Sequence, residues 1–309
     1  MRRNFTIHVM RGGNYDLHHI ICSIHALPCD VVQIRRGGYN DSYLSPKTTN
    51  IEKGIAALYI ILHHLAQAVD RPSVFSVMGY VGFILVAVFY FISGYGLMYG
   101  LLHKENYLHG FLRKRLIAVL LPYWIVNAAF IVVRLMQGES FKTLDVVLSF
   151  LGFDTVVGTW FVTSILIMYL LFWITFSLCG KLRWNENVGL IILTVSVLIY
   201  CVCCYAIGLH TSWTASIGTF LFGCCFYKFK DRLEEWFREK WIVKIVMATS
   251  VFLLLFVGRL GLAYIGVENE LLHFVLRNII SASFVIFILC LTQKVMFEST
   301  PGSDPIKKK

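Results

Sequence analysis

Eight long apolar runs constrain the fold of this chain more than any other feature. About 20 apolar residues are needed to cross a hydrocarbon core of ~30 Å, and a segment in lipid must satisfy its own backbone hydrogen bonds, which a helix does. The chain has 309 residues, of which 57% are hydrophobic and only 15% charged. We therefore predict an all-α, polytopic integral membrane helical bundle of about eight transmembrane helices. The runs expected to span the membrane are residues 53–69, 80–102, 116–136, 158–179, 188–208, 212–228, 242–265 and 271–293.

One further apolar segment, Thr143 to Phe153, is too short to span the membrane. Counting it as a span would place the basic loop at Lys181 on the side opposite the other basic loops. We interpret the segment as a short re-entrant or interfacial helix.

The distribution of charge predicts how the chain is oriented. The net charge is +10, and the cations cluster next to apolar runs, as in cytoplasmic loops. We therefore expect a multi-pass protein of the cell membrane with both termini in the cytoplasm. Because the cations sit in short loops that flank apolar spans, we expect no nucleic-acid partner. The segments expected on the cytoplasmic side are 103–115, 181–183, 228–240 and 294–309.

The chain divides into three parts by composition. Residues 1–50 form a polar, basic N-terminal extension, which we expect in the cytoplasm, residues 51–295 form the membrane domain, and residues 296–309 form a basic cytoplasmic tail. Most of the nine cysteines lie inside apolar runs, where cysteine usually behaves as a small hydrophobic residue. Cys201-Val-Cys-Cys204 lacks a second ligand pair at zinc spacing, so we expect no metal site and no bound cofactor.

The first apolar run carries two ionisable residues, Lys53 and His64, eleven positions apart. Eleven residues complete three helical turns to within about 20°, so both side chains share one stripe, with His64 roughly 16 Å further along. We expect this imidazole near the middle of the membrane, where ionisable residues mark a functional site. A structural histidine bonded across helices is the alternative for His64, and it is the default for His63, about 100° round the helix.

Three more elements follow in order along the chain. A serine, Ser93, interrupts an aromatic run; a triple cation, Arg113 to Arg115, enters a helix that contains a proline; and Trp160 precedes an apolar run. Each has a simpler interpretation. In this simpler interpretation the cations serve only as an anchor for the helix at the cytoplasmic face, Ser93-Gly94 allows close helix packing, and Trp160 belongs to an interfacial belt.

Taken together, these four elements resemble the acyltransferase 3 family, integral membrane enzymes that acylate, most often acetylate, extracytoplasmic carbohydrates. The resemblance covers roughly residues 50–295. The matching motifs are Lys53 and His64 for an arginine, ten residues and a histidine; Tyr90-Phe91-Ile-Ser93-Gly94 for Phe-Phe-x-x-Ser-Gly; Arg113 to Pro122 for a basic motif before proline; and Trp160-Phe161 for Trp-Phe.

The chain departs from the family pattern in three places. Lysine replaces arginine at position 53, so bidentate contact with a phosphate becomes a point-charge contact. Ala118 stands where the family has a second cation, three residues after Arg115. Family members usually continue with further membrane segments, one with a Tyr-Leu-x-His-like sequence, so this chain, which stops at Lys309, is expected to lack them.

The resemblance implies transfer of an acyl group, most simply acetyl, from cytosolic acyl-CoA as co-substrate to a hydroxyl of an extracytoplasmic carbohydrate. The residue chemistry is compatible, because histidine is the usual base for a hydroxyl proton and a phosphate-rich donor needs cations. A small-solute transporter or flippase-like carrier with a histidine proton relay, and an inactive truncated remnant, remain alternatives. The implied roles are His64 as the catalytic base, Lys53, Arg113 and Arg115 for the donor, and Ser93 and Trp160 for the substrate.

Overall fold

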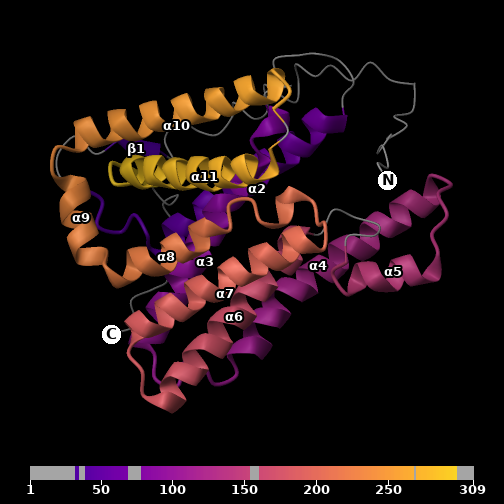
Figure 1. Ribbon diagram of the computed structural model, residues 1–309, viewed down its shortest axis with the longest axis horizontal. Helices are drawn as coiled ribbons and strands as arrows, with labels where there is room; N and C mark the ends of the chain where they lie inside the picture. The colour runs from indigo at the N-terminus through magenta and orange to yellow at the C-terminus, as the bar shows by residue number, and fades with distance from the viewer. Residues whose placement is uncertain (1–31, 35–38, 69–77, 154–159, 268, 298–309) are drawn as a thin grey trace, which may run out of the picture.

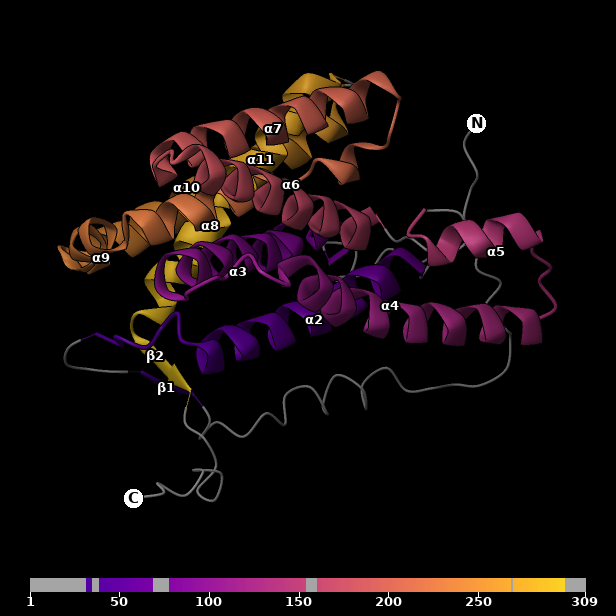
Figure 2. The ribbon, with the colours of Figure 1, turned by 90° about the horizontal axis from the view of Figure 1, so that it is seen from below.

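The chain folds into a bundle of long helices (Figure 1), with a small two-stranded sheet at one end (Figure 2). This computed structural model describes residues 32–34, 39–68, 78–153, 160–267 and 269–297. The two strands pair antiparallel, with Val32 opposite Phe297. The elements are β1 (Val32–Ile34), α2 (Pro46–Ala68), α3 (Gly82–His103), α4 (Phe111–Met136), α5 (Thr143–Phe150), α6 (Trp160–Leu182), α7 (Glu186–Ala206), the 3₁₀ helix η3 (Thr211–Trp213), α8 (Gly218–Lys228), α9 (Lys230–Arg238), α10 (Trp241–Tyr264), α11 (Glu270–Thr292) and β2 (Val295–Phe297).

Six of these helices are long and apolar enough to cross a membrane, namely α3, α4, α6, α7, α10 and α11. This confirms the prediction of a polytopic helical membrane protein. Two of the eight expected spans, however, are not among these six helices. The first, α2, has 23 residues but carries Glu52, Lys53, His63 and His64, which lower its hydropathy. The second, residues 212–228, is divided between η3 and α8, and α8 has only 11 residues.

The break before α8 is stabilised by polar contacts from neighbouring helices. Ser216, whose φ is 67°, donates its hydroxyl to the carbonyl oxygen of Phe83 (2.6 Å) and lies 2.7 Å from the hydroxyl of Ser281. Asn278 of α11 donates to the carbonyl oxygen of Thr214 (3.2 Å) and accepts from the amide of Gly218 (2.9 Å). Non-helical backbone is tolerated at membrane depth because other protein groups satisfy it in this way.

The central helix of the bundle is α3, and it crosses α8 at very close range. A Cβ atom added at Gly94 would lie 2.1 Å from the carbonyl oxygen of Phe220, and one added at Gly223 would lie 2.2 Å from that of Phe91. Small residues at such crossings let two helix backbones touch. Gly94 thus has the close-packing role that the simpler interpretation of Ser93-Gly94 predicts.

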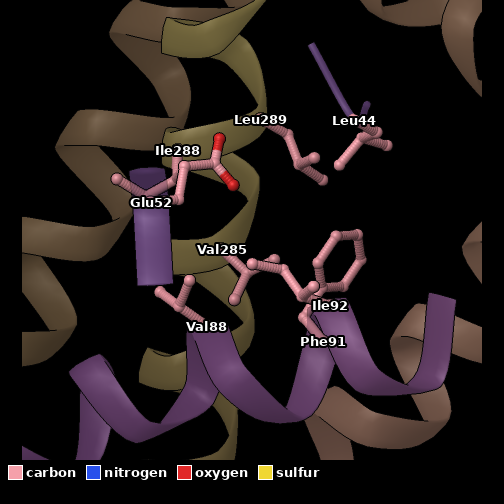
Figure 3. A pocket seen from close by; sticks show the side chains of 8 residues that line it. All are labelled: Leu44, Glu52, Val88, Phe91, Ile92, Val285, Ile288 and Leu289. Carbon is pink, nitrogen blue, oxygen red and sulfur yellow. The ribbon is translucent and has the colours of Figure 1, made fainter. Parts of the chain in front are cut away.

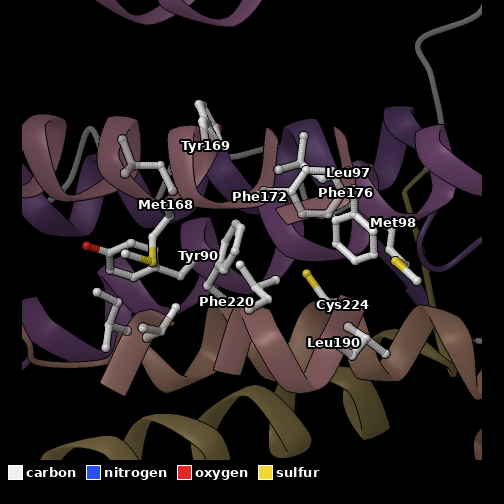
Figure 4. Close-up of a cluster of buried hydrophobic side chains, with 14 of the residues drawn as sticks. Tyr90, Leu97, Met98, Met168, Tyr169, Phe172, Phe176, Leu190, Phe220 and Cys224 are labelled. Atoms are coloured by element: carbon white, nitrogen blue, oxygen red, sulfur yellow. The ribbon is translucent and has the colours of Figure 1, made fainter. Parts of the chain in front are cut away.

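The main hydrophobic core lies where α3, α6, α7 and α8 meet (Figure 4). Its side chains are a mixture of aliphatic and aromatic groups. Several aromatic pairs pack ring against ring, such as Phe172 and Phe176 with centroids 4.6 Å apart. The fully buried members include Tyr90, Leu97, Met98, Met168, Phe172, Leu193, Ile217 and Phe220.

Most of the basic loops gather at one end of the bundle. Arg238 of α9 forms an ion pair with Asp41 at 2.5 Å, and Lys228 forms one with Glu186 at 3.1 Å. The hydroxyl of Tyr227 lies 3.1 Å from Nδ1 of His103. These contacts join the segment before α2, the end of α3, the start of α7, the end of α8 and the end of α9. The gathering agrees with loops that share one side of a membrane, and the cytoplasmic assignment of that side remains a prediction.

The short apolar segment forms α5, a helix of 8 residues that lies beside the second half of α4 (Figure 2). Asn127 and Ser149, both buried, exchange hydrogen bonds of 2.7 and 3.0 Å, and Trp124 donates to the carbonyl oxygen of Phe150 at 2.9 Å. The expected short helix is therefore present.

Both predicted domain boundaries fall inside elements of the structure. Helix α2 begins at Pro46 and so crosses the boundary at residue 50, and β2 crosses the boundary at residue 295. The rest of the predicted extension, residues 1–31 and 35–38, and the tail residues 298–309 lie outside the described residues.

The α3–α8 crossing predicts the effect of two glycine substitutions on the same helix. Gly94→Ala should destabilise the protein by about 1–3 kcal/mol, because overpacking forces the two backbones apart. Gly96→Ala is the matched control, since a Cβ there meets nothing within 4 Å. It should be neutral or stabilising by up to about 1 kcal/mol, because alanine favours helix. Thermal unfolding in detergent measures both, and equal effects would contradict the close crossing.

Candidate functional site

Five polar residues from four elements and one loop converge between the start of α4, at the end of the bundle with the basic loops, and the middle of α3 and α6. The hydroxyl of Ser93 on α3 lies 3.1 Å from that of Tyr169 on α6. The guanidinium carbon of Arg115 on α4 lies 5.8 Å from the ring centroid of Tyr169, and its Nη2 donates to the hydroxyl of Tyr107 at 3.0 Å. Lys53 on α2 is near enough to interact electrostatically with Arg115. We call these residues the Arg115 cluster.

Two glycines of α3 help to set this geometry. The close contact at Gly94 fixes the rotation of α3, and therefore directs the preceding residue, Ser93, toward α6. At Gly100 an added Cβ would lie 2.4 Å from the ring of Tyr107, so the loop after α3 can fold back with this ring against the helix only because the side chain is absent. Tyr107 then faces Arg115.

The Arg115 cluster holds two cations and no acidic residue, although Glu52, next to Lys53 on α2, interacts electrostatically with Lys53. Neither Lys53 nor Arg115 takes part in an ion pair among the described residues. The neighbouring acid, Glu52, lines a small apolar pocket between α2, α3 and α11 instead (Figure 3). Like charges held together in a partly buried place repel, and an anion bound between them removes that cost. The arrangement suits a phosphate or carboxylate.

Arg113 does not belong to the cluster. It is exposed, whereas Arg115 is partly buried. The two side chains differ because residues two positions apart on a helix point in directions about 200° apart. No described contact gives Arg113 a role beyond that of a surface cation, which fits the interpretation of a helix anchor. Its predicted role in donor binding remains a prediction.

The stripe that joins Lys53 to His64 faces the protein along most of its length. Ala56 is only 4% exposed, and Ile60 packs against two of the hydrophobic cores. At the end of the stripe His64 is exposed, and its ring meets that of His63 edge-on with centroids 5.0 Å apart. In the part of the chain that the structure describes, the His64 side chain is therefore accessible.

His63 has the contacts of a structural residue. Its Nδ1 donates to the carbonyl oxygen of Met78 at 2.8 Å, and its ring fills the space beside Gly82, where an added Cβ would lie 2.4 Å from Nε2. These contacts tie the end of α2 to the first residue of α3.

The same contacts correct the expected depth of His64. Gly82 is the first residue of α3, so both histidines lie near the end of the bundle opposite the basic loops and not at mid-depth. The reason is that α2 begins at Pro46, which places Lys53 about 10 Å along the helix already. Lys53 and His64 remain roughly 16 Å apart along the axis.

Trp160 lies away from the Arg115 cluster. It begins α6, nine residues and roughly 14 Å before Tyr169. Its indole packs edge-on against Phe161 (centroids 6.1 Å apart), which in turn contacts Phe89 and Tyr90. Trp160 is partly buried and lies nearer in depth to the histidines than Tyr169 does. Its predicted contact with substrate remains a prediction.

Sequence reasoning did not assign Tyr107 and Tyr169 to the site. Tyr169 follows the fourth motif, but no spacing indicated that it faces Arg115, and the position of Tyr107 depends on a loop that folds over Gly100. Two further arginines, Arg259 and Arg277, were also missed. A sequence signal for them exists, because each is an arginine inside a long apolar run.

The comparison with family models confirms the family resemblance that the sequence motifs indicate. Residues 50–302 match the model of the acyltransferase 3 family, described as an acyltransferase domain. The match covers well over half of the chain, so the chain belongs to this family of membrane acyltransferases. Neither a curated protein nor a solved structure matches it.

The geometry predicts that Arg115, and not Arg113, binds an anion. Binding of inorganic diphosphate to the protein in phosphatidylcholine nanodiscs should weaken roughly tenfold or more in Arg115→Gln, which removes a charge-assisted contact. The matched variant Arg113→Gln loses the same charge two residues away and should change the Kd very little. Equal losses in the two variants would mean that only general electrostatic attraction is at work.

Proposed function

We propose that the protein is an O-acyltransferase that moves an acyl group, most simply acetyl, from cytosolic acyl-CoA to a hydroxyl of an extracytoplasmic carbohydrate. The observation that carries this proposal is the pair of cations, Lys53 and Arg115, held together toward the end of the bundle with the basic loops and outside every ion pair of the described residues. That end faces the cytoplasm under the positive-inside rule, where acyl-CoA is found. Membership of the acyltransferase family supports the reaction class.

The donor site uses the two cations differently. Arg115 is already fixed by Tyr107 and by the rings of Phe111 and Tyr169, so several of its N–H donors remain for phosphate oxygens. Lys53 adds a point charge on a flexible stem. Ser93, bonded to Tyr169 at the same depth, lines the path that the donor takes beyond its phosphates.

The distance between the cations and His64 fits a donor with a long arm. In acyl-CoA a flexible arm separates the thioester from the phosphates, so the two ends need not meet at one point. With the phosphates at Lys53 and Arg115, the arm would run along the α2 stripe toward His64, roughly 16 Å away. The thioester would then reach the opposite end of the bundle, where an extracytoplasmic sugar arrives.

His64 would act as the general base. Its neutral imidazole takes the proton of the sugar hydroxyl, the hydroxyl oxygen bonds to the carbonyl carbon of the thioester, and the carbon–sulfur bond breaks. The imidazolium returns the proton to the leaving thiolate, which gives free CoA and an ester. Trp160, at the start of α6, offers an aromatic face for the sugar ring.

Two adjacent histidines give a matched test of this mechanism. Membranes that contain the protein should transfer label from acetyl-labelled acetyl-CoA to a glycan fraction, and His64→Ala should reduce the rate about 100-fold or more. His63→Ala should chiefly lower the free energy of unfolding, by about 1 kcal/mol for the lost hydrogen bond to Met78. It should reduce acyl transfer far less than His64→Ala does.

Two results would contradict the proposed mechanism. Similar loss of transfer at both histidines would show a structural pair and remove His64 as the base. Solute movement across vesicles without formation of a labelled ester would replace the acyltransferase with the carrier hypothesis.

A further inference from the structure

Two arginines meet in the membrane-spanning helices at the end opposite the basic loops. Arg259 lies on α10, about 8 Å from the end of that helix, and Arg277 lies on α11, about 10 Å from its start. The guanidinium carbon of Arg259 lies 4.9 Å from the ring centroid of Phe83 on α3, and Nη1 of Arg277 donates to the hydroxyl of Thr211 on η3 at 2.5 Å. The two guanidinium groups interact electrostatically.

Several of their donors have no partner. The Nε and Nη1 atoms of Arg259 and the Nε atom of Arg277 are buried and lack any hydrogen bond among the described residues. Neither arginine has an acidic partner within that part of the chain. His273, one turn before Arg277 on α11, also has a buried Nδ1 without a partner, while its Nε2 donates to the carbonyl oxygen of Val267 at 2.7 Å.

Neither anchoring nor local hydrogen bonding accounts for this pair of arginines. Positive-inside anchoring places cations at the cytoplasmic end, whereas these lie at the other end. Burying a charge without a partner is costly, and holding two like charges together adds to the cost. Other nearby polar groups are already used, because Asn278 and Ser216 bond to the broken segment before α8 and to α3.

We propose that Arg259 and Arg277 form a second anion site, which binds a carboxylate or phosphate group of a molecule that reaches the protein from the end opposite the basic loops. A planar guanidinium fork matches the geometry of both groups, and the unpartnered donors of two forks can surround one anion. Of the remaining groups near Arg259, Tyr80 is exposed and interacts with it electrostatically.

The position of this second anion site links it to the proposed reaction. Phe83, under Arg259, follows Gly82, against which His63 packs, so the second anion site and the histidines lie at the same depth. If the proposed function holds, the bound anion belongs to the acceptor, and this acceptor is an acidic saccharide. The anion site itself does not depend on that function, because binding can be measured without acyl transfer.

The test compares charged and neutral sugars on the full chain. In phosphatidylcholine nanodiscs, glucuronate and glucose 1-phosphate should bind and glucose should not. Arg277→Gln and Arg259→Gln should each weaken this binding roughly tenfold or more. Arg134→Gln is the matched control, because Arg134 also lies away from the basic loops, at the end of α4, but pairs with Glu139 at 2.6 Å. In a second arm, nanodiscs with phosphatidylglycerol test whether a lipid headgroup supplies the anion.

Each outcome decides the proposal. Loss of sugar binding in both variants but not in Arg134→Gln supports the second anion site with a soluble ligand. Thermal stabilisation by phosphatidylglycerol that disappears in both variants supports it with a lipid ligand. Arg277→Lys, which keeps the charge, covers the case in which Arg277→Gln fails to fold, and it should retain part of the binding. Unchanged binding in the variants, or no anion preference in the wild type in either arm, overturns the proposal.

Discussion

The backbone contact between α3 and α8 is the constraint on which the rest of the structure depends. Gly94 and Gly223 let the two helices touch, and this contact fixes both the rotation and the depth of α3. Because α3 is the most buried of the six spans, its rotation decides which neighbour each of its faces meets. One face presents Ser93 to α6. The first turn of α3 packs against His63 of α2 and contains Phe83, whose ring lies beneath Arg259.

The resulting bundle has cationic groups of different kinds at its two ends. Some cations of the basic loops pair with acids of the chain, as Arg238 does with Asp41, while Arg115 behind them contacts aromatic rings and a hydroxyl group. At the other end two arginines lie with buried, unbonded donors. Under the proposed function the anionic donor binds at one end and the acceptor at the other, and the reacting groups meet near His64 at the acceptor end.

The sequence was sufficient for what depends on local pattern. Hydropathy located α3, α4, α6, α7, α10 and α11, and segment length distinguished α5 from a span. It did not show that residues 212–228 break, because the break relies on hydrogen bonds to Phe83 and Ser281, which are distant in the chain. The Lys53 to His64 spacing predicted their shared stripe, but its depth depends on where α2 starts. The partners of Arg115 required the folded loop at Tyr107.

The most direct test of this account is an experimental structure of the protein with coenzyme A bound. We predict density for the phosphates between Lys53 and Arg115, with the pantetheine arm running along the α2 stripe and the thiol near His64. Phosphates bound elsewhere, or a thiol that remains at the end with the basic loops, would contradict the account.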